Sequence, residues 1–496
     1  MKNKYVLILL LSAIFSACTK PEIAPDNEPI ISPSSTNELQ LIADSVYLFS
    51  REIYFGDAIR TSPYDYTSFK PRSLVLTDAV ATAKAVIEKV KTANFYDESK
   101  DFSYATAYDD DAGASSAAQT INDYGFYFKA GYKDRKIKNS LYANDPDFEG
   151  FYITYVYHNS DAGKKGVQRG WKMISVNGTS MSSISNTTVN ILNNMFYNET
   201  LKSADIVFEK PGGQQVSLNL SITSFVPNSV LYREKLVSST GRSVGYLVYN
   251  FFGKYNDTKA DIDEAIQYFK NAGINEVVLD LRYNRGGYTQ TETYLTNNFG
   301  PSAANNQVMY KMIYNANLQA GNYTMMRTRH GYSKDYYSVP KNTYYFSTTN
   351  SISTTKLYVI VSNSSASASE LFINSLRPYY NNNLILIGDN NTYGKPVGFF
   401  PIHLFKKVTF WTVSFETRNK NDGAVPYTGI GPDFRIYDGV DKNWGDQTED
   451  CLKAALNLID GKLATASVVV STVPRNVTPL QIKQKEVFEH SNLLYE

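Results

Sequence analysis

The chain has 496 residues, of which 43% are hydrophobic and 20% are charged. This is the composition of a folded protein of about three or four domains, and it excludes a wholly disordered chain. The formal net charge is +1, so charge gives no reason to expect binding to nucleic acid or to an acidic membrane surface.

The first 18 residues have the pattern of a secretory signal. Lys2 and Lys4 precede an apolar run that is shorter than the ~20 residues of a membrane span, and small residues lead to Cys18. A cysteine there resembles the lipobox of bacterial lipoproteins, although Phe15 replaces the usual Leu. We expect a signal peptide over residues 1–18, a lipid anchor at Cys18 and a place in the cell envelope, in the outer membrane. A plain signal peptide with an incidental cysteine is the alternative.

The composition of the next segments changes along the chain. Residues 19–36 are rich in Pro, Ser and Asn, which predicts a flexible linker. Residues 37–118 carry apolar side chains at helical spacing, which predicts a small helical N-terminal domain. Short runs of β-favouring residues predict a β-rich domain over residues 119–225.

Strand and helix patterns alternate over residues 226–465. The nearly continuous apolar runs at 277–281 and 357–361 are typical of buried parallel strands. The alternation predicts an α/β domain, so the fold class of the whole chain is multidomain α/β. Residues 466–496 form a tail without an assigned role.

A candidate nucleophile, Ser367, lies in the sequence S-A-S-A-S-E at 365–370. It follows a predicted buried strand and begins a predicted helix, whose free N–H groups and dipole favour developing negative charge. The N–H of Ala368 is therefore placed to bind an oxyanion. The segment also fits the S-x-x-E capping box, and a structural N-cap is the commoner role for such a segment alone.

Two other segments could complete a site. Lys395 lies in a glycine-containing loop, and burial can lower a lysine pKa from ~10.4 to ~7–8, where it serves as a base for a serine. A lone lysine in such a loop is usually a surface residue, so its pairing with Ser367 carries this prediction. The sequence D-L-R-Y-N-R-G-G at 280–287 ends a strand in two glycines that let backbone N–H groups approach a ligand. A plain tight turn is the alternative.

These segments in this order resemble the C-terminal processing, or tail-specific, serine peptidases. That family has a D-L-R-x-N-x-G-G turn, an S-A-S-A-S-E segment, a later G-K lysine and a G-I-x-P-D segment, which 429–433 matches. The resemblance spans roughly residues 119–460. It implies a PDZ-like domain at 119–225 and a crotonase-like α/β serine peptidase core at 226–465.

The resemblance also implies the site residues. Ser367 would be the nucleophile, Lys395 its general base, and Ala368 with Gly287 the oxyanion hole, Gly286 being the alternative to Gly287. No cofactor is implied, and the chain has no zinc, calcium or phosphate-loop motif.

Tyr124-Gly125-Phe126 resembles the PDZ loop that receives the C-terminal carboxylate of a peptide. The adjoining strand would pair with the peptide by β-augmentation, so the expected partners are proteins or peptides with free C-termini. An ordinary β-domain with a glycine turn is the alternative.

Two departures from the family leave other functions open. Lys395 follows Ser367 by 28 residues, a slightly longer separation than usual. Phe399 stands where many members have a Gln that orients the lysine, so a third catalytic member is missing or comes from elsewhere. His403 is a weak candidate. An inactive peptide-binding lipoprotein and an adaptor for another protease therefore remain alternatives, and the oligomeric state is open.

Overall fold

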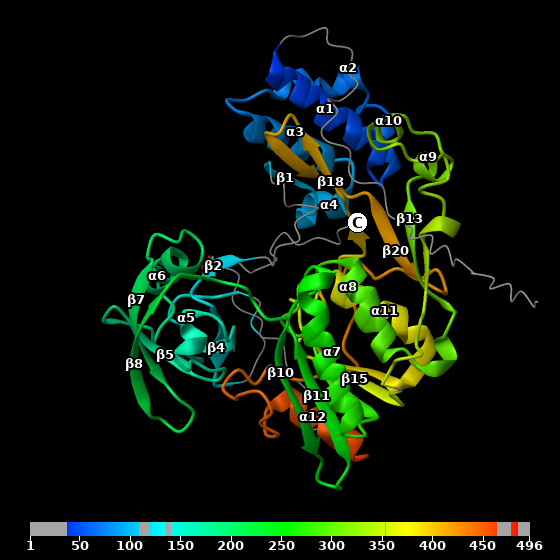
Figure 1. Cartoon of the computed structure of the whole chain (residues 1–496). Helices are drawn as coiled ribbons and strands as arrows, with labels where there is room; N and C mark the ends of the chain where they lie inside the picture. The colour runs from blue at the N-terminus through cyan, green and yellow to red at the C-terminus, as the bar shows by residue number, and fades with distance from the viewer. Residues whose placement is uncertain are drawn as a thin grey trace, which may run out of the picture.

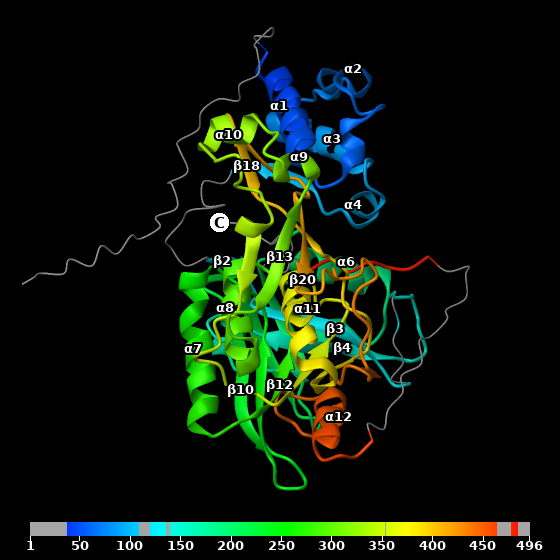
Figure 2. The same cartoon turned by 90° about the vertical axis from the view of Figure 1, so that its right-hand side faces the viewer.

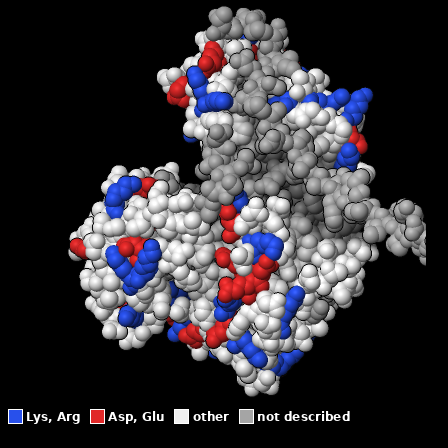
Figure 3. Space-filling model, in the orientation of Figure 1, with Lys and Arg blue, Asp and Glu red and all other residues white. Residues whose placement is uncertain are grey.

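The computed structural model describes residues 37–108, 120–134, 138, 140–352, 354–463 and 478–484. Cys18, the expected signal peptide and linker, and most of the expected tail lie outside these residues. None of the helices in the described part combines the length and the hydropathy that a membrane crossing needs. Figure 3 shows acidic and basic side chains interspersed over one face, in keeping with the small net charge.

The N-terminal region, residues 37–108, is blue in Figure 1. Asn37 caps its first helix by accepting hydrogen bonds from two N–H groups. Val46 and Val86, on two helices of this region, are fully buried. Its elements are α1 (Glu38–Ile53), α2 (Tyr66–Phe69), α3 (Ala79–Lys91), α4 (Phe95–Lys100) and β1 (Tyr104–Ala107).

A distant part of the chain completes this region. β1 pairs with β19 (Val408–Trp411), which pairs with β18 (Pro401–Leu404), in an antiparallel three-stranded sheet. Two of its three strands therefore come from the segment 226–465 that was expected to form the core alone. The N-terminal region is thus helical with one sheet, and the chain crosses between it and the core more than once (Figure 1).

The β-rich region, residues 120–225, has a six-stranded sheet in the order β3-β4-β5-β7-β8, with β6 beside β5. The Asn177-Gly178 turn between β5 and β6 has φ values of 47° and 78°, as the Asn-Gly pair predicts. The elements are β2 (Ile121–Asp123), β3 (Phe126–Tyr132), β4 (Phe148–Val156), α5 (Asp161–Lys164), β5 (Lys172–Val176), β6 (Thr179–Ser180), α6 (Asn186–Phe196), β7 (Ser203–Glu209), β8 (Gln215–Ser221) and β9 (Thr223–Phe225).

The core, residues 226–463, contains a six-stranded sheet in the order β10-β11-β12-β15-β16-β21. β10 is antiparallel to β11, and the other neighbours are parallel. The elements are β10 (Val230–Val237), β11 (Ser243–Tyr249), α7 (Tyr255–Asn271), β12 (Glu276–Asp280), α8 (Thr289–Phe299), β15 (Lys356–Val361), α11 (Ala368–Tyr380), β16 (Leu384–Gly388), β21 (Phe434–Arg435) and α12 (Asp450–Ile459).

Helices cover both faces of this sheet, which explains its apolar strands. Val277 and Leu279 belong to the same hydrophobic cluster as residues of α7, α8 and α11. Val278, between them, packs in a second cluster with residues of α12. Successive side chains of a strand point to opposite faces, so both faces need apolar residues.

A second sheet connects the core to the N-terminal region. Its order is β14-β13-β20-β17, with β13 (Val308–Tyr314), β14 (Thr343–Tyr345), β17 (Val397–Gly398) and β20 (Phe415–Asn419). Figures 1 and 2 show β13 and β20 reaching towards the N-terminal region, where α9 (Ala316–Gln319) and α10 (Met325–His330) follow β13. Glu52 of α1 accepts hydrogen bonds from the first N–H groups of α10.

Candidate active site

The three predicted motifs follow three neighbouring parallel strands, β12, β15 and β16. Their carboxyl ends meet at one edge of the sheet, where α/β proteins place ligands. Backbone hydrogen bonds then tie the loops together: Ala366 N–H donates to Asn284 O at 3.1 Å, and Tyr393 N–H donates to Ser365 O at 2.9 Å. The structure thus brings together three parts of the chain: the turn at 280–287, the segment 365–370 with Ser367 (the serine segment) and the loop with Lys395 that follows β16 (the lysine loop).

Ser367 begins α11 in an unusual backbone conformation. Its φ is +58°, a value that costs free energy in a residue with a side chain, and such strain concentrates at functional sites. The residue is 1% exposed. Its Oγ faces the helix start as in a capping box, yet makes no hydrogen bond to any described residue. The serine is therefore buried and not hydrogen bonded to Lys395 in this structure.

Glu370 joins the serine segment to the lysine loop. Its Oε2 accepts hydrogen bonds from the N–H groups of Ser367 at 2.8 Å and Lys395 at 2.9 Å. Its Oε1 accepts from Gly394 N–H at 2.7 Å and from the Thr392 hydroxyl at 2.5 Å. Burial raises the pKa of this carboxyl, and the four donors act against that rise. One buried side chain thus fixes the position of both proposed catalytic residues.

Two backbone N–H groups near the serine have no hydrogen-bond acceptor within the described part of the chain. Among the described residues, neither Ala368 N–H nor Gly287 N–H donates a recorded hydrogen bond, whereas Gly286 N–H donates to Asn284 Oδ1 at 2.8 Å. Gly286 lies close to the turn at Ser367, because a Cβ added to Gly286 would be 2.8 Å from the Cβ of Ser367. Of the two glycines, Gly287 therefore has the available donor.

Lys395 has an environment that favours the neutral amine. Burial lowers its pKa to about 8, against the opposing influence of Asp97 and Glu370. Its Nζ lies 4.5 Å from the ring centroid of Phe399 and 5.7 Å from that of Phe102. Phe399, which stands where many C-terminal processing peptidases have a Gln, therefore presents its aromatic face to the lysine.

The N-terminal region builds one wall of this lysine environment. Asp97 of α4 accepts hydrogen bonds from the Tyr54 hydroxyl at 2.7 Å and from Ser103 N–H at 2.7 Å, and burial raises its pKa. Lys100 Nζ donates to Tyr393 O on the lysine loop at 2.5 Å. The helices expected only as a separate small domain thus contact the site directly.

The segment that matches G-I-x-P-D supports the lysine loop from its other side. Ile430 N–H donates to the Thr392 hydroxyl at 2.7 Å, and Thr392 N–H donates to Ile430 O at 3.0 Å. Gly429 has a φ of +79°, and a Cβ there would meet Thr392 O at 1.8 Å. Glycine is therefore required for this close backbone approach.

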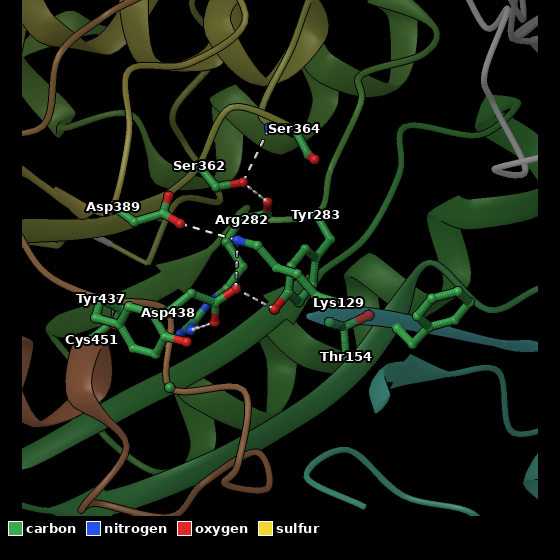
Figure 4. Close-up of polar contacts among 12 residues, drawn as sticks. Lys129, Thr154, Arg282, Tyr283, Ser362, Ser364, Asp389, Tyr437, Asp438 and Cys451 are labelled. Atoms are coloured by element: carbon green, nitrogen blue, oxygen red, sulfur yellow. Dashed lines mark hydrogen bonds and ion pairs between the residues drawn. The ribbon is translucent and has the colours of Figure 1, made fainter. Parts of the chain in front are cut away.

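An ion network behind the glycine turn joins the core to the β-rich region (Figure 4). Asp438 pairs with Arg282 at 2.8 Å, with Arg169 of the β-rich region at 3.0 Å and with Lys129 of β3 at 3.4 Å. Lys129 also pairs with Asp389 at 3.1 Å. Burial alone would raise the pKa of Asp438, but the three cations hold it far below its ordinary value. The arginine of the D-L-R motif therefore connects the site to the β-rich region.

The predicted carboxylate-binding loop is buried. Tyr124, Gly125 and Phe126 are all inaccessible, and Gly125 has a φ of +82°. The N–H of Gly125 donates to the side chain of Asp123. Burial raises the pKa of Asp123 to about 7. A peptide carboxylate at this loop would therefore share it with an internal carboxyl group.

The remaining candidates contribute no further site. His403 lies on β18, where its Nδ1 hydrogen bonds with the Thr409 hydroxyl at 2.9 Å. Within the described ranges, no group of His, Cys, Asp and Glu is arranged to hold a metal ion.

Comparisons with known proteins agree with this geometry. Residues 243–436 match the model of Peptidase family S41. The chain carries a peptidase family S41 domain. Carboxy-terminal processing protease CtpB of Bacillus subtilis (strain 168) is 25% identical over 194 residues, which are 36% of this chain and 38% of that protein. The match thus spans less than two thirds of this curated relative.

The crystal structure of a protein described as an S41 protease, from Bacteroides fragilis NCTC 9343, has the same fold. It aligns with a TM-score of 0.57 at 22% identity and covers 84% of this chain and 97% of that one. The family match and the curated relative confirm the predicted family and support a serine-type peptidase, and the crystal structure shows the same fold.

Sequence reasoning missed several residues of the candidate site. Glu370 was read as one half of a capping box, although it also holds the lysine loop. Asp97 and Phe102 gave no signal, because neither lies in a motif and their relevance depends on how the N-terminal region packs. Phe399 was noted as a departure, but its contact with Lys395 was not predicted.

Proposed function

We propose that the chain is a serine endopeptidase of the cell envelope that cleaves proteins or peptides with a Ser367–Lys395 dyad. One observation carries the proposal: Lys395, with a pKa lowered to about 8, lies on a loop that Glu370 ties to the strained serine turn. An amine with this pKa is partly neutral at neutral pH and can accept the proton of a serine hydroxyl.

The reaction follows from these positions. Ser367 Oγ attacks the scissile carbonyl carbon while Lys395 Nζ accepts the hydroxyl proton. The N–H groups of Ala368 and Gly287 stabilise the oxyanion of the tetrahedral intermediate. Lys395 then protonates the leaving amine, and a water activated by the same lysine hydrolyses the acyl-enzyme. Because Ser367 is buried, substrate binding must open the site.

Substrate recognition is assigned to the β-rich region, acting as a PDZ-like domain. An extended peptide would lie against β3, with its C-terminal carboxylate at Tyr124-Gly125-Phe126. The ion network through Asp438 would connect this binding event to the turn that carries Gly287. Lipid modification at Cys18 would hold the enzyme at the outer membrane.

The proposal is tested by hydrolysis of peptides that end in apolar residues. We expect Ser367→Ala to abolish cleavage, whereas Ser364→Ala, the same change at a half-exposed serine three residues away, should leave it near the wild-type rate. Cleavage by the Ser367→Ala protein at the wild-type rate would refute the assignment.

A second function is a peptide-binding protein without turnover, alone or as an adaptor for another protease. Phe399 and the absence of a hydrogen bond to Ser367 Oγ favour it. A serine-directed fluorophosphonate probe separates the two functions. Labelling that is lost in Ser367→Ala supports the peptidase. Tight peptide binding without labelling supports the inactive protein.

A further inference from the structure

A short segment near the C-terminus lies on the β-rich region. The N–H of Leu480 donates to Leu141 O at 2.8 Å, and the two residues form an antiparallel bridge. Leu480 and Ile482 pack against the hydrophobic cluster of this region. Figure 2 shows the segment, in red, running beside α6. Residues 480–484 are called the tail segment below.

The tail segment has the exposure pattern of a bound strand. Leu480, Ile482 and Gln484 are partly buried, while Gln481 and Lys483 between them are exposed. An extended peptide places alternate side chains on opposite sides, so one side of the segment faces the protein. This side carries two apolar residues and one amide.

Side chains of α6 and β3 bind the tail segment from two directions. The Asn193 amide of α6 donates to Gln481 O at 3.2 Å and accepts from Lys483 N–H at 2.8 Å. The Gln484 amide accepts from Phe128 N–H at 3.3 Å and donates to Phe128 O at 3.1 Å on β3. The Gln484 side chain therefore satisfies both backbone groups of Phe128 on an end strand of the sheet, where an added peptide strand would use its own backbone.

The two ends of the tail segment are held at different places on the β-rich region. Leu480 lies at Leu141, beyond the end of β3, and Gln484 lies at Phe128, near its start. The tail segment thus contacts residues at and beyond β3 through Leu480 at one end and Gln484 at the other. Phe128 and Phe196 have ring centroids 5.1 Å apart, so β3 and α6 pack directly against each other beside the tail segment.

The same segment borders the loops of the S41 site. Ile482 and Gln484 line a cavity of about 230 Å³ together with Asn363, Asp389 and Lys129. Asn363 precedes the serine segment, and Asp389 precedes the lysine loop. The tail segment therefore lines the same cavity as residues next to both proposed catalytic segments.

We propose that the tail segment is an intramolecular ligand of the surface formed by β3 and α6 and competes there with extended segments of protein substrates. This inference rests on the proposed peptide-binding role of the β-rich region. It also names the substrate class: extended peptides with apolar side chains at alternate positions, as at Leu480 and Ile482, followed by an amide two residues later. A tethered ligand acts at millimolar effective concentration, so free peptides compete at a disadvantage until the tail leaves.

The test measures binding of a fluorescein-labelled peptide, T-P-L-Q-I-K-Q with an amidated end, by anisotropy. All proteins carry Ser367→Ala, so cleavage does not interfere. Release of the tail by Leu480→Asp with Ile482→Asp should tighten binding about tenfold, as expected when a competitor occupies this surface about nine-tenths of the time. Gln481→Asp, at an exposed side chain between them, should bind like the parent.

A second variant locks the tail in place. Leu141→Cys with Leu480→Cys replaces an antiparallel pair, whose Cα separation suits a disulfide. Oxidation should abolish peptide binding, and a reductant should restore it. Equal affinity of the parent, released and locked proteins would overturn the inference and leave the proposed peptidase untouched. Shifts in both variants, with no hydrolysis by the protein that retains Ser367, would support the inference and count against the peptidase.

Discussion

The ring of Phe399 lies against the ammonium of Lys395, with its centroid 4.5 Å from Nζ. A ring face attracts a cation and so stabilises the charged form of the lysine. Burial acts in the opposite direction and lowers the pKa to about 8. Phe399 therefore contacts Lys395 through its ring face. At this position, many C-terminal processing peptidases are expected to orient the lysine with a Gln.

Replacing this ring should lower the lysine pKa further. Because a desolvated cation–π contact contributes about 2 kcal/mol, Phe399→Leu should move the midpoint of the kcat/KM profile down by about 1.5 pH units. The measurement is kcat/KM against pH. Phe400→Leu, the same change at the next buried residue, should keep the wild-type midpoint. An unchanged midpoint in Phe399→Leu would show that the ring does not stabilise the ammonium.

The pH dependence of the wild-type enzyme follows from Lys395 itself. The proposed mechanism needs the neutral amine, so kcat/KM should rise as the pH increases through about 8, the pKa of Lys395, and then level off. Lys395→Arg should lose activity at every pH, because a guanidinium is not deprotonated in this range. Lys406→Arg, at an exposed lysine, is the control. A profile that is flat between pH 6 and 9 would exclude Lys395 as the base.

Glu370 should act as a positioning residue. Glu370→Gln keeps the size of the side chain but replaces one accepting oxygen with a donor, which disturbs the hydrogen bonds to Ser367, Gly394 and Lys395. We expect kcat to fall about 10–100-fold, about 1.4–2.8 kcal/mol, with little change in KM. Anisotropy with the labelled peptide should show unchanged binding. Equal losses in binding and in kcat would indicate a general loss of structure instead.

Much of the core could be predicted from the sequence, for a physical reason. Strands that are covered on both faces must be apolar throughout, so the runs at 277–281 and 357–361 predict buried parallel strands. In such sheets, ligand-binding and catalytic residues lie at the carboxyl ends of the strands. The match to Peptidase family S41 and the curated relative confirm the predicted family. The Asn177-Gly178 turn was visible because few residue pairs accept its dihedral angles.

Contacts between distant segments could not be predicted. The partner of Thr106 in β1 is Thr409 in β19, and no local pattern links two such strands. Asp97 and Phe102 lie near Lys395 only because the sheet of β1, β19 and β18 joins the N-terminal region to the core. The tail segment was equally hidden, since its alternating pattern has meaning only beside β3 and α6.

The glycine turn allows a matched test of steric fit at the site. Gly286 has a φ of +100°, and a Cβ there would lie 2.8 Å from Ala366 O, Ala368 N and Ser367 Cβ. Gly273 has a φ of +66°, but its Cβ would point into open space. Alanine at either position should cost about 1 kcal/mol of unfolding free energy through its backbone conformation.

The Gly286→Ala change must in addition displace the turn at Ser367. A catalytic group that is misplaced by about 1 Å can lower the rate about 100-fold. We therefore expect kcat/KM and labelling of Ser367 by a fluorophosphonate to fall about 100-fold in Gly286→Ala and to stay near wild type in Gly273→Ala. Denaturant unfolding of both variants separates the shared backbone cost from the displacement. Equal activity of the two alanine variants would mean that the turn tolerates a side chain and that Gly286 is kept for its dihedral angles alone.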